Sequence, residues 1–218
     1  RHEPVRAGDA LVFPARFGDF SNSARKLREF DYNFEQDKHK APPLTIISEH
    51  ISGGGIGELS YAQEPNSIIW SVRDDGQIVG TTYEREQDVV AFYREVIGGS
   101  FGNGNAEVET EAVIPGDYGD ELWMCVKRTI DGQTVRYIEY SSRELQIDDV
   151  KEDMVYLDSS ATYDGSATTT ISGLYHLRGE EVGVLGDGTR QLNKTVSSTG
   201  TITIDSAEKV HIGYRITS

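Results

Sequence analysis

The sequence has a single cysteine, a shortage of basic residues and no long hydrophobic run. Cys125 is the only cysteine among 218 residues, which excludes an intrachain disulfide framework and any multi-cysteine metal site. We expect it to be a small core or strand residue rather than a reactive thiol. No stretch of about 18 apolar residues is present, so the sequence predicts no membrane segment. Residues 1–4 carry no signal-peptide pattern, and we expect Arg1 to follow a cut in a longer polypeptide or to begin its ordered part.

Acidic residues outnumber basic residues in this chain. The sequence has 21 lysines and arginines against 36 acids, a formal net charge of −15. A protein that grips nucleic acid needs a surplus of cations to displace counterions from the phosphates. The charge therefore argues against a phosphate-binding surface. Two local basic spots, residues 25–28 and Lys127-Arg128, are flanked by acids, and we expect them to pair with a neighbouring subunit.

No residues have the spacing of a catalytic, metal or cofactor site, so we predict that the protein is not an enzyme and has no cofactor. The acids Glu84, Glu86 and Asp88 resemble the paired carboxylates of a glycosidase, but adjacent loop acids more often form an ion-paired surface. The glycine-rich stretches 53–57 and 102–104 lack the Gly-Lys-Ser/Thr of a phosphate loop.

The histidines and the other acids also give no indication of a catalytic or metal site. The five histidines show none of the close pairings of a zinc site. Ser172 precedes His176 without a nucleophile elbow. Glu107, Glu109 and Glu111 alternate along one strand, where their mutual repulsion predicts a face toward solvent or a lumen.

Short strands joined by tight turns dominate the first 149 residues. Asp75-Gly76 separates two apolar runs, 68–72 and 78–83, which is the strongest local signal for a β-hairpin. Earlier in the chain, a β-hairpin or a long β-arm is predicted around the polar turn 18–23. One short helix is predicted over residues 44–51, where apolar residues recur at helical spacing after two prolines. Residues 98–105 are predicted to form a long flexible loop.

An internal repeat links two of these segments. Glu121-Leu122-Trp123 echoes Ile68-Ile69-Trp70, and Asp131-Gly132-Gln133 echoes Asp75-Gly76-Gln77. A period of about 40 to 50 residues with three or four strands per unit is typical of β-propeller blades. We therefore predict an incomplete propeller over residues 1–149, with Trp70 and Tyr83 packed between neighbouring sheets.

A second region follows an acidic connector, residues 144–153. It is rich in Thr, Ser and Gly and contains short strand patterns at spacings of about ten residues. The sequence predicts a separate small β-sandwich or barrel domain over residues 150–218, with the boundary near Asp149. The whole chain is therefore expected to be all-β.

Several segments resemble tail proteins of short-tailed bacteriophages, of the tail tubular, tail nozzle or DNA-stabilisation type. The resemblance rests mainly on residues 63–73, Asp75-Gly76 and 82–89, with support from 27–34 and 41–50. Further segments continue it to the C-terminal region: 120–123, 127–132, 136–139, 157–159, 162–163, 169–174 and 210–213.

The resemblance implies a structural virion protein made in the bacterial cytoplasm. Copies would form a homo-oligomeric ring or nozzle with other tail proteins, and DNA would pass through without specific binding. An acidic wall suits this passage, because it repels phosphates. The alternative is a β module of a phage tail or a secreted protein that binds host-surface glycans. A ring of copies at a virion tail would favour the first hypothesis, and retention on a glycan array would favour the second.

Overall fold

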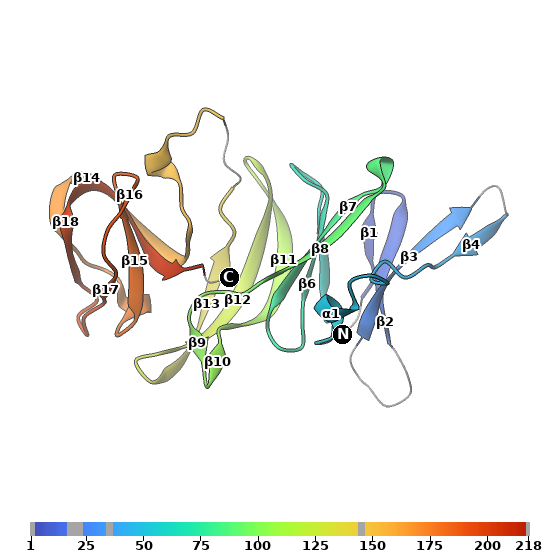
Figure 1. The fold of residues 1–218 in the computed structure, drawn as a ribbon, viewed down its shortest axis with the longest axis horizontal. Coiled ribbons are helices and arrows are strands. Elements are labelled where there is room, and N and C mark those ends of the chain that lie inside the picture. The colour runs from blue at the N-terminus through green and yellow to red at the C-terminus, as the bar shows by residue number, and fades with distance from the viewer. Residues whose placement is uncertain (1–2, 17–23, 34–36, 144–146, 217–218) are drawn as a thin grey trace. The chain divides into compact units, whose positions relative to one another are not determined.

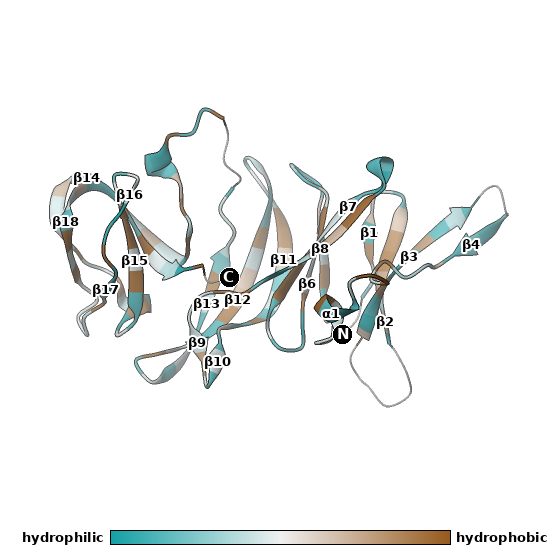
Figure 2. Ribbon diagram, in the orientation of Figure 1, coloured by the Kyte–Doolittle hydropathy of each residue, from teal (hydrophilic) through white to brown (hydrophobic). Residues whose placement is uncertain are grey.

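The fold is all-β, as predicted. The computed structural model describes residues 3–16, 24–33, 37–143 and 147–216 (Figure 1). Strands account for 60% of the residues and helical turns for 6%. Within the described ranges, no helix is long and apolar enough to cross a membrane. Hydropathy follows the strands: β7 and β15 carry hydrophobic segments, whereas β4 is largely hydrophilic (Figure 2).

The chain forms two compact units that interleave along the sequence. The first contains residues 1–95, 107–126 and 138–141, and the second contains 96–106, 127–137 and 142–218. The predicted boundary near Asp149 thus falls inside the second unit, because the chain passes between the units several times before that point. Independent folding of residues 150–218 stays a prediction.

The first sheet of unit 1 is an antiparallel meander in the order β1-β2-β3-β4. The strands are β1 (Val5–Ala7), β2 (Ala10–Arg16), β3 (Ala24–Asn33) and β4 (Lys38–Lys40). Pairing of β2 with β3 confirms the predicted first hairpin, although its turn lies outside the described residues. Val12 and Leu27 are buried on the inner face, whereas Leu11 and Phe30 on the other face are 39% and 40% exposed.

The second sheet has the order β5-β6-β7-β8 and contains the predicted Asp-Gly hairpin. Its strands are β5 (Leu59–Ala62), β6 (Ile68–Val72), β7 (Ile78–Glu84) and β8 (Val89–Glu95), with the 3-10 turn η2 (Arg85–Gln87) between the last two. Gly76 has φ 75°, which explains why this turn needs glycine. Ile69 and Tyr83 pack against the first sheet with Val12 and Leu27.

The opposite face of this sheet packs against β11 (Glu107–Gly116). Ser60, Trp70, Gly80 and Tyr93 lie in one row across the four strands. The Trp70 and Tyr93 rings meet edge to face with centroids 5.9 Å apart. They do so over Gly80, where an added Cβ would lie 2.2 Å from the Tyr93 ring. Trp70 is half-buried and Tyr83 is buried on the other face, so each lies between sheets as predicted.

The third sheet has the order β11-β12-β13, with β12 (Gly119–Ile130) and β13 (Gln133–Tyr140). Asp131 and Gly132 both have positive φ, 50° and 72°, as a two-residue hairpin turn requires. The Ser141 N–H donates to the Leu122 carbonyl at 2.9 Å, which keeps the two strands in register along their length. Two of the sheets are four-stranded antiparallel meanders, which is the strand order of a propeller blade, whereas this one has three strands. A radial propeller arrangement stays a prediction.

The predicted helix is present but shorter and later than expected. The α-helix α1 covers Glu49–Ser52 only, and residues 44–47 form a turn. The Leu44 N–H donates to the Leu27 carbonyl at 2.8 Å, so this segment is tied to β3 instead of continuing a helix. Ile47, which the helical pattern places on its apolar face, is 84% exposed.

The loop predicted over residues 98–105 is instead an ordered hairpin of unit 2. Strands β9 (Ser100–Phe101) and β10 (Gly104–Asn105) pair across a turn in which Gly102 has φ 59°. The Lys127 ammonium lies 4.0 Å from the Phe101 ring centroid. Glycines therefore shape a turn here rather than provide flexibility.

Some of the short strands predicted after residue 150 merge into two long ones, whereas others are present as short strands. Strand β14 (Leu157–Ile171) pairs with β18 (Ile202–Arg215), and three register shifts interrupt the ladder. Polar residues at these bulges broke the period-2 pattern, so the sequence indicated separate strands. The sheet continues β14-β18-β15-β16, and β17 also pairs with β15. The remaining elements are η3 (Lys151–Asp153), η4 (Tyr175–Leu177), β15 (Glu181–Gly186), β16 (Thr189–Arg190) and β17 (Lys194–Thr195).

Limited proteolysis will test the separate folding of residues 150–218. This region holds most of a buried cluster that includes Leu177, Val184 and Ile212, but Ile130 from outside the region belongs to the cluster too. We expect a stable C-terminal fragment after cleavage near residues 144–153. Cleavage there that yields only an unfolded peptide would refute the predicted domain.

Candidate functional site

The three acids within residues 84–88 lie next to a polar contact that joins the first sheet to the second. Glu84 accepts from the Ser67 N–H at 3.3 Å, and Glu86 and Asp88 are exposed. Arg85 Nε lies 3.1 Å from Glu29 Oε1, which also accepts from the Tyr83 hydroxyl at 2.8 Å. Burial raises the pKa of Tyr83, and the hydrogen bond to Glu29 raises it further. These groups join the first sheet to the second, which gives the stretch a structural role.

Glu111 departs from the exposed glutamate face predicted for β11. Glu109 is exposed, but Glu111 is only 8% exposed and lies against β5. The Ser60 hydroxyl donates to Glu111 Oε2, while Oε1 is buried and has no hydrogen-bond partner among the described residues. Burial raises the pKa of Glu111 to about 7, and the nearby Glu58 carboxylate adds to the effect. A raised pKa suits a general acid, but burial keeps this carboxyl from contact with a substrate.

Glycines near residues 54 and 99 make room for buried arginines rather than phosphates. In unit 1, Arg73 is 8% exposed and donates to the Ile51 carbonyl and to Asp75, both at 2.8 Å. A Cβ at Gly54 would lie 2.2 Å from the Arg73 guanidinium. The chain therefore needs glycine at position 54 for packing.

In unit 2, Arg128 is fully buried, which corrects its predicted place in a subunit contact. Its Nε donates to the Gly98 carbonyl at 2.8 Å, and its guanidinium lies 5.4 Å from the Tyr214 ring centroid. The Gly98 N–H donates to Asp158 at 2.7 Å. Gly99 has φ 98°, and a Cβ there would lie 2.8 Å from Arg128. Arg128 is therefore an internal residue that holds the segment at residues 98–99.

The histidines contribute to separate structural contacts. His211 is buried, contacts the Thr162 hydroxyl through Nδ1 and donates from Nε2 to the Glu152 carbonyl, both at 2.8 Å. His176 donates from Nε2 to the Ser159 carbonyl at 3.1 Å, and His39 stacks on Phe30. His2 lies outside the described residues. Over the described ranges, no three His, Cys, Asp or Glu side chains converge as metal ligands.

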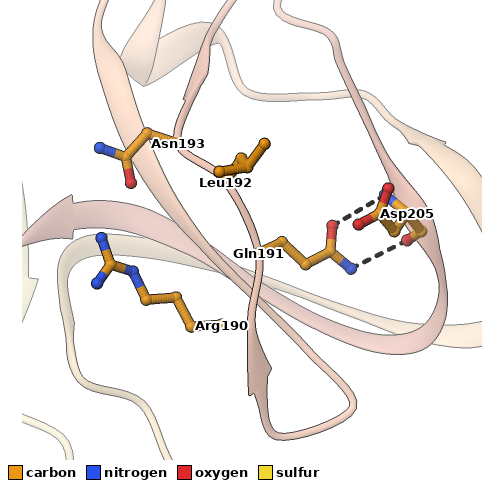
Figure 3. A pocket seen from close by; sticks show the side chains of 5 residues that line it. All are labelled: Arg190, Gln191, Leu192, Asn193 and Asp205. Atoms are coloured by element: carbon orange, nitrogen blue, oxygen red, sulfur yellow. Dashed lines mark hydrogen bonds between the residues drawn. The ribbon is translucent and has the colours of Figure 1, made fainter.

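A surface hollow in unit 2 was not anticipated from the sequence. It has a volume of about 650 Å³ and is lined by five residues, Arg190, Gln191, Leu192, Asn193 and Asp205 (Figure 3). Arg190 and Asn193 lie on one side of the chain segment, and Gln191 points to the other side toward Asp205. In the sequence this segment shows only a strand pattern over 192–196, with no polar motif to mark a site.

A second surface feature is a partly apolar sheet face in unit 1, which we call the Trp123 face: Glu121, Trp123, Ile138 and Tyr140. Trp123 and Tyr140 stack with centroids 4.9 Å apart, and the Trp123 Nε1 donates to Glu121 at 2.9 Å. Ile138 and Tyr140 are 68% and 57% exposed. Contiguous exposed apolar groups of this kind are typical of interaction surfaces.

Comparison with known proteins adds no relative: no family model and no curated protein matches the sequence.

Proposed function

We propose that the protein is a structural component of a bacteriophage tail, in which copies form a ring or nozzle around the DNA channel. The resemblance to tail proteins of short-tailed phages motivates this role. The observation that carries it is the Trp123 face, an exposed apolar surface on a sheet. An enzyme is disfavoured because the candidate acids described above serve sheet contacts or are exposed on a turn.

The internal repeat indicates what covers the Trp123 face. Trp123 corresponds to Trp70 in the repeat, and the face that carries Trp70 packs against β11 through Ser60 and Glu111. By the same logic, the Trp123 face is expected to pack against another sheet. We assign that sheet to a second copy of this chain.

The first sheet offers a matching surface, the Leu11 face: Arg6, Leu11, Phe13, Arg28 and Phe30. Arg6, Leu11 and Phe30 lie in one row across β1, β2 and β3, and Phe13 lies opposite Arg28. Leu11 and Phe30 are partly exposed. This face carries two arginines, whereas the Trp123 face carries Glu121, so the surfaces complement each other in charge. Contact between two different faces is head-to-tail, and such contacts close into rings when the rotation permits.

The net charge of −15 fits a channel wall over which DNA moves. Each persistent Lys or Arg contact to phosphate would add to the barrier for movement along the channel. Weak contact with duplex DNA is therefore part of the proposed function.

Charge insertion will test the assembly. We expect light scattering to show multimers of the wild-type chain. Ile138→Glu should weaken association at least about tenfold, because it places an acid in an apolar contact. Ile47→Glu is the matched control, since Ile47 is 84% exposed and lies on neither face. Its association should equal that of the wild type.

A mixing experiment distinguishes head-to-tail contact from a symmetric dimer. Leu11→Glu and Ile138→Glu should each be monomeric alone. Mixed together, they retain one intact Leu11 face and one intact Trp123 face, so they should form a dimer and nothing larger. A monomeric wild type at high concentration, or equal loss in Ile47→Glu, would contradict the proposed interface.

A further inference from the structure

The hollow in unit 2 lies at a β-bulge. Leu185 pairs with Arg190 on β16, and Val182 pairs with Lys194 on β17. Between these pairs, three residues, 191–193, face only two on β15. The extra residue pushes Leu192 outward, and its side chain is 81% exposed. Bulges commonly re-aim side chains next to binding sites.

Gln191 gives the hollow a fixed wall. Its Nε2 donates to the Asp205 carbonyl at 3.0 Å, and its Oε1 accepts from the Asp205 N–H at 2.9 Å (Figure 3). The side chain lies over Gly186, where a Cβ would be 2.5 Å from Gln191 Nε2. Two hydrogen bonds to one backbone residue hold the amide in place, so the wall is preformed.

Several groups around the hollow have unused bonding capacity. Asn193 Nδ2 donates to Glu181 at 2.9 Å, while Asn193 Oδ1 is buried and has no hydrogen-bond partner in the described ranges. Neither the exposed Arg190 guanidinium nor the exposed Asp205 carboxylate has a side-chain partner within the described part of the chain.

We propose that this hollow binds an acidic oligosaccharide. Arg190 pairs with a sugar carboxylate, and Asp205 accepts from a sugar hydroxyl. Leu192 packs against the apolar C–H face of the ring. A nucleotide fits less well, because none of the five lining side chains is aromatic and no base would stack there.

The expected affinity of one hollow is weak. The site is open to solvent, the ligand is flexible and the net charge of the protein opposes an anion. A dissociation constant on the order of 1 mM is reasonable for such a contact. Several copies in one assembly would raise the overall avidity. The hollow itself is contained in one chain and does not depend on the proposed ring.

Ligand-observed NMR titration of the whole chain tests the proposal with three probes: an oligogalacturonate, a neutral malto-oligosaccharide of equal length and inorganic phosphate. We expect saturable binding of the oligogalacturonate alone. Arg190→Ala should weaken it at least about tenfold. Arg25→Ala is the matched control, because Arg25 is an exposed arginine on β3 of unit 1, and it should bind as the wild type does. Circular dichroism of each variant confirms that it is folded.

Gln191→Ala adds a test of the preformed wall. Gln191 is a positioning residue. Its loss should therefore weaken the binding of the oligogalacturonate and leave Arg190 able to attract simple anions. If the neutral malto-oligosaccharide binds as tightly as the oligogalacturonate, the hollow does not recognise a sugar carboxylate, and the proposal is wrong. Equal binding of phosphate would reduce the hollow to a simple anion site, and equal weakening by Arg25→Ala would assign the binding to non-specific charge attraction.

Discussion

Arg128→Ala should lower the free energy of unfolding by about 4 kcal/mol, the largest stability effect expected from a single substitution in unit 2. The side chain is fully buried, so truncation leaves a cavity beside Tyr214 and removes the donor to the Gly98 carbonyl. Gly98 and Gly99 would lose the group against which they pack. Chemical denaturation monitored by fluorescence and circular dichroism measures the change.

Two further variants separate packing from charge. Arg128→Lys keeps the cation but does not reproduce the guanidinium geometry at Gly98, so an intermediate loss is expected. Arg25→Ala changes an exposed arginine and should alter stability by less than about 0.5 kcal/mol. Equal stability of Arg128→Ala and the wild type would mean that Arg128 does not support this core.

Glu111→Gln should stabilise the protein at neutral pH and leave it unchanged in acid. The pKa of Glu111 is about 7 in the folded chain, above the ordinary value of 4.5. Below pH 4.5 the carboxyl is protonated in both states and carries no penalty. As pH rises from 4.5 to 7 the unfolded chain loses this proton first, so the wild type loses stability, by up to about 3 kcal/mol. Glutamine does not titrate and avoids that loss.

Denaturation at pH 4 and pH 8 measures this difference. The gain from Glu111→Gln should be near zero at pH 4 and reach about 2–3 kcal/mol at pH 8. Glu86→Gln is the matched control, because Glu86 is an exposed glutamate of the same unit, and it should alter stability by less than about 0.5 kcal/mol at either pH. A gain of equal size at both pH values in Glu111→Gln would show that the effect comes from packing rather than from titration.

The sequence predicted the parts of the fold that local chemistry determines. The Asp75-Gly76 hairpin and the paired β2 and β3 were found because turn residues and period-2 patterns act over a few residues. The helix at 44–51 was wrong in extent because a hydrogen bond from Leu44 to Leu27 ties the segment to β3. Such a contact between distant residues leaves no periodic signal.

The sequence also did not predict the buried polar groups or the hollow. Arg128 and Glu111 look like surface residues in a chain rich in charge, and only the packing of Gly98-Gly99 and β5 around them shows otherwise. The hollow depends on one extra residue between β16 and β17, and a strand pattern does not reveal a shift in register. Aromatic repeats were informative, because Trp70 and Trp123 both lie on sheet faces that suit packing against another sheet.

Electron microscopy of the purified, assembled protein tests whether copies of this chain form a ring. We expect closed rings with one dominant copy number, an open central channel and no rings in the Ile138→Glu variant. Monomers, two-fold symmetric dimers without a channel or open filaments from the wild-type chain would contradict a tail ring around DNA.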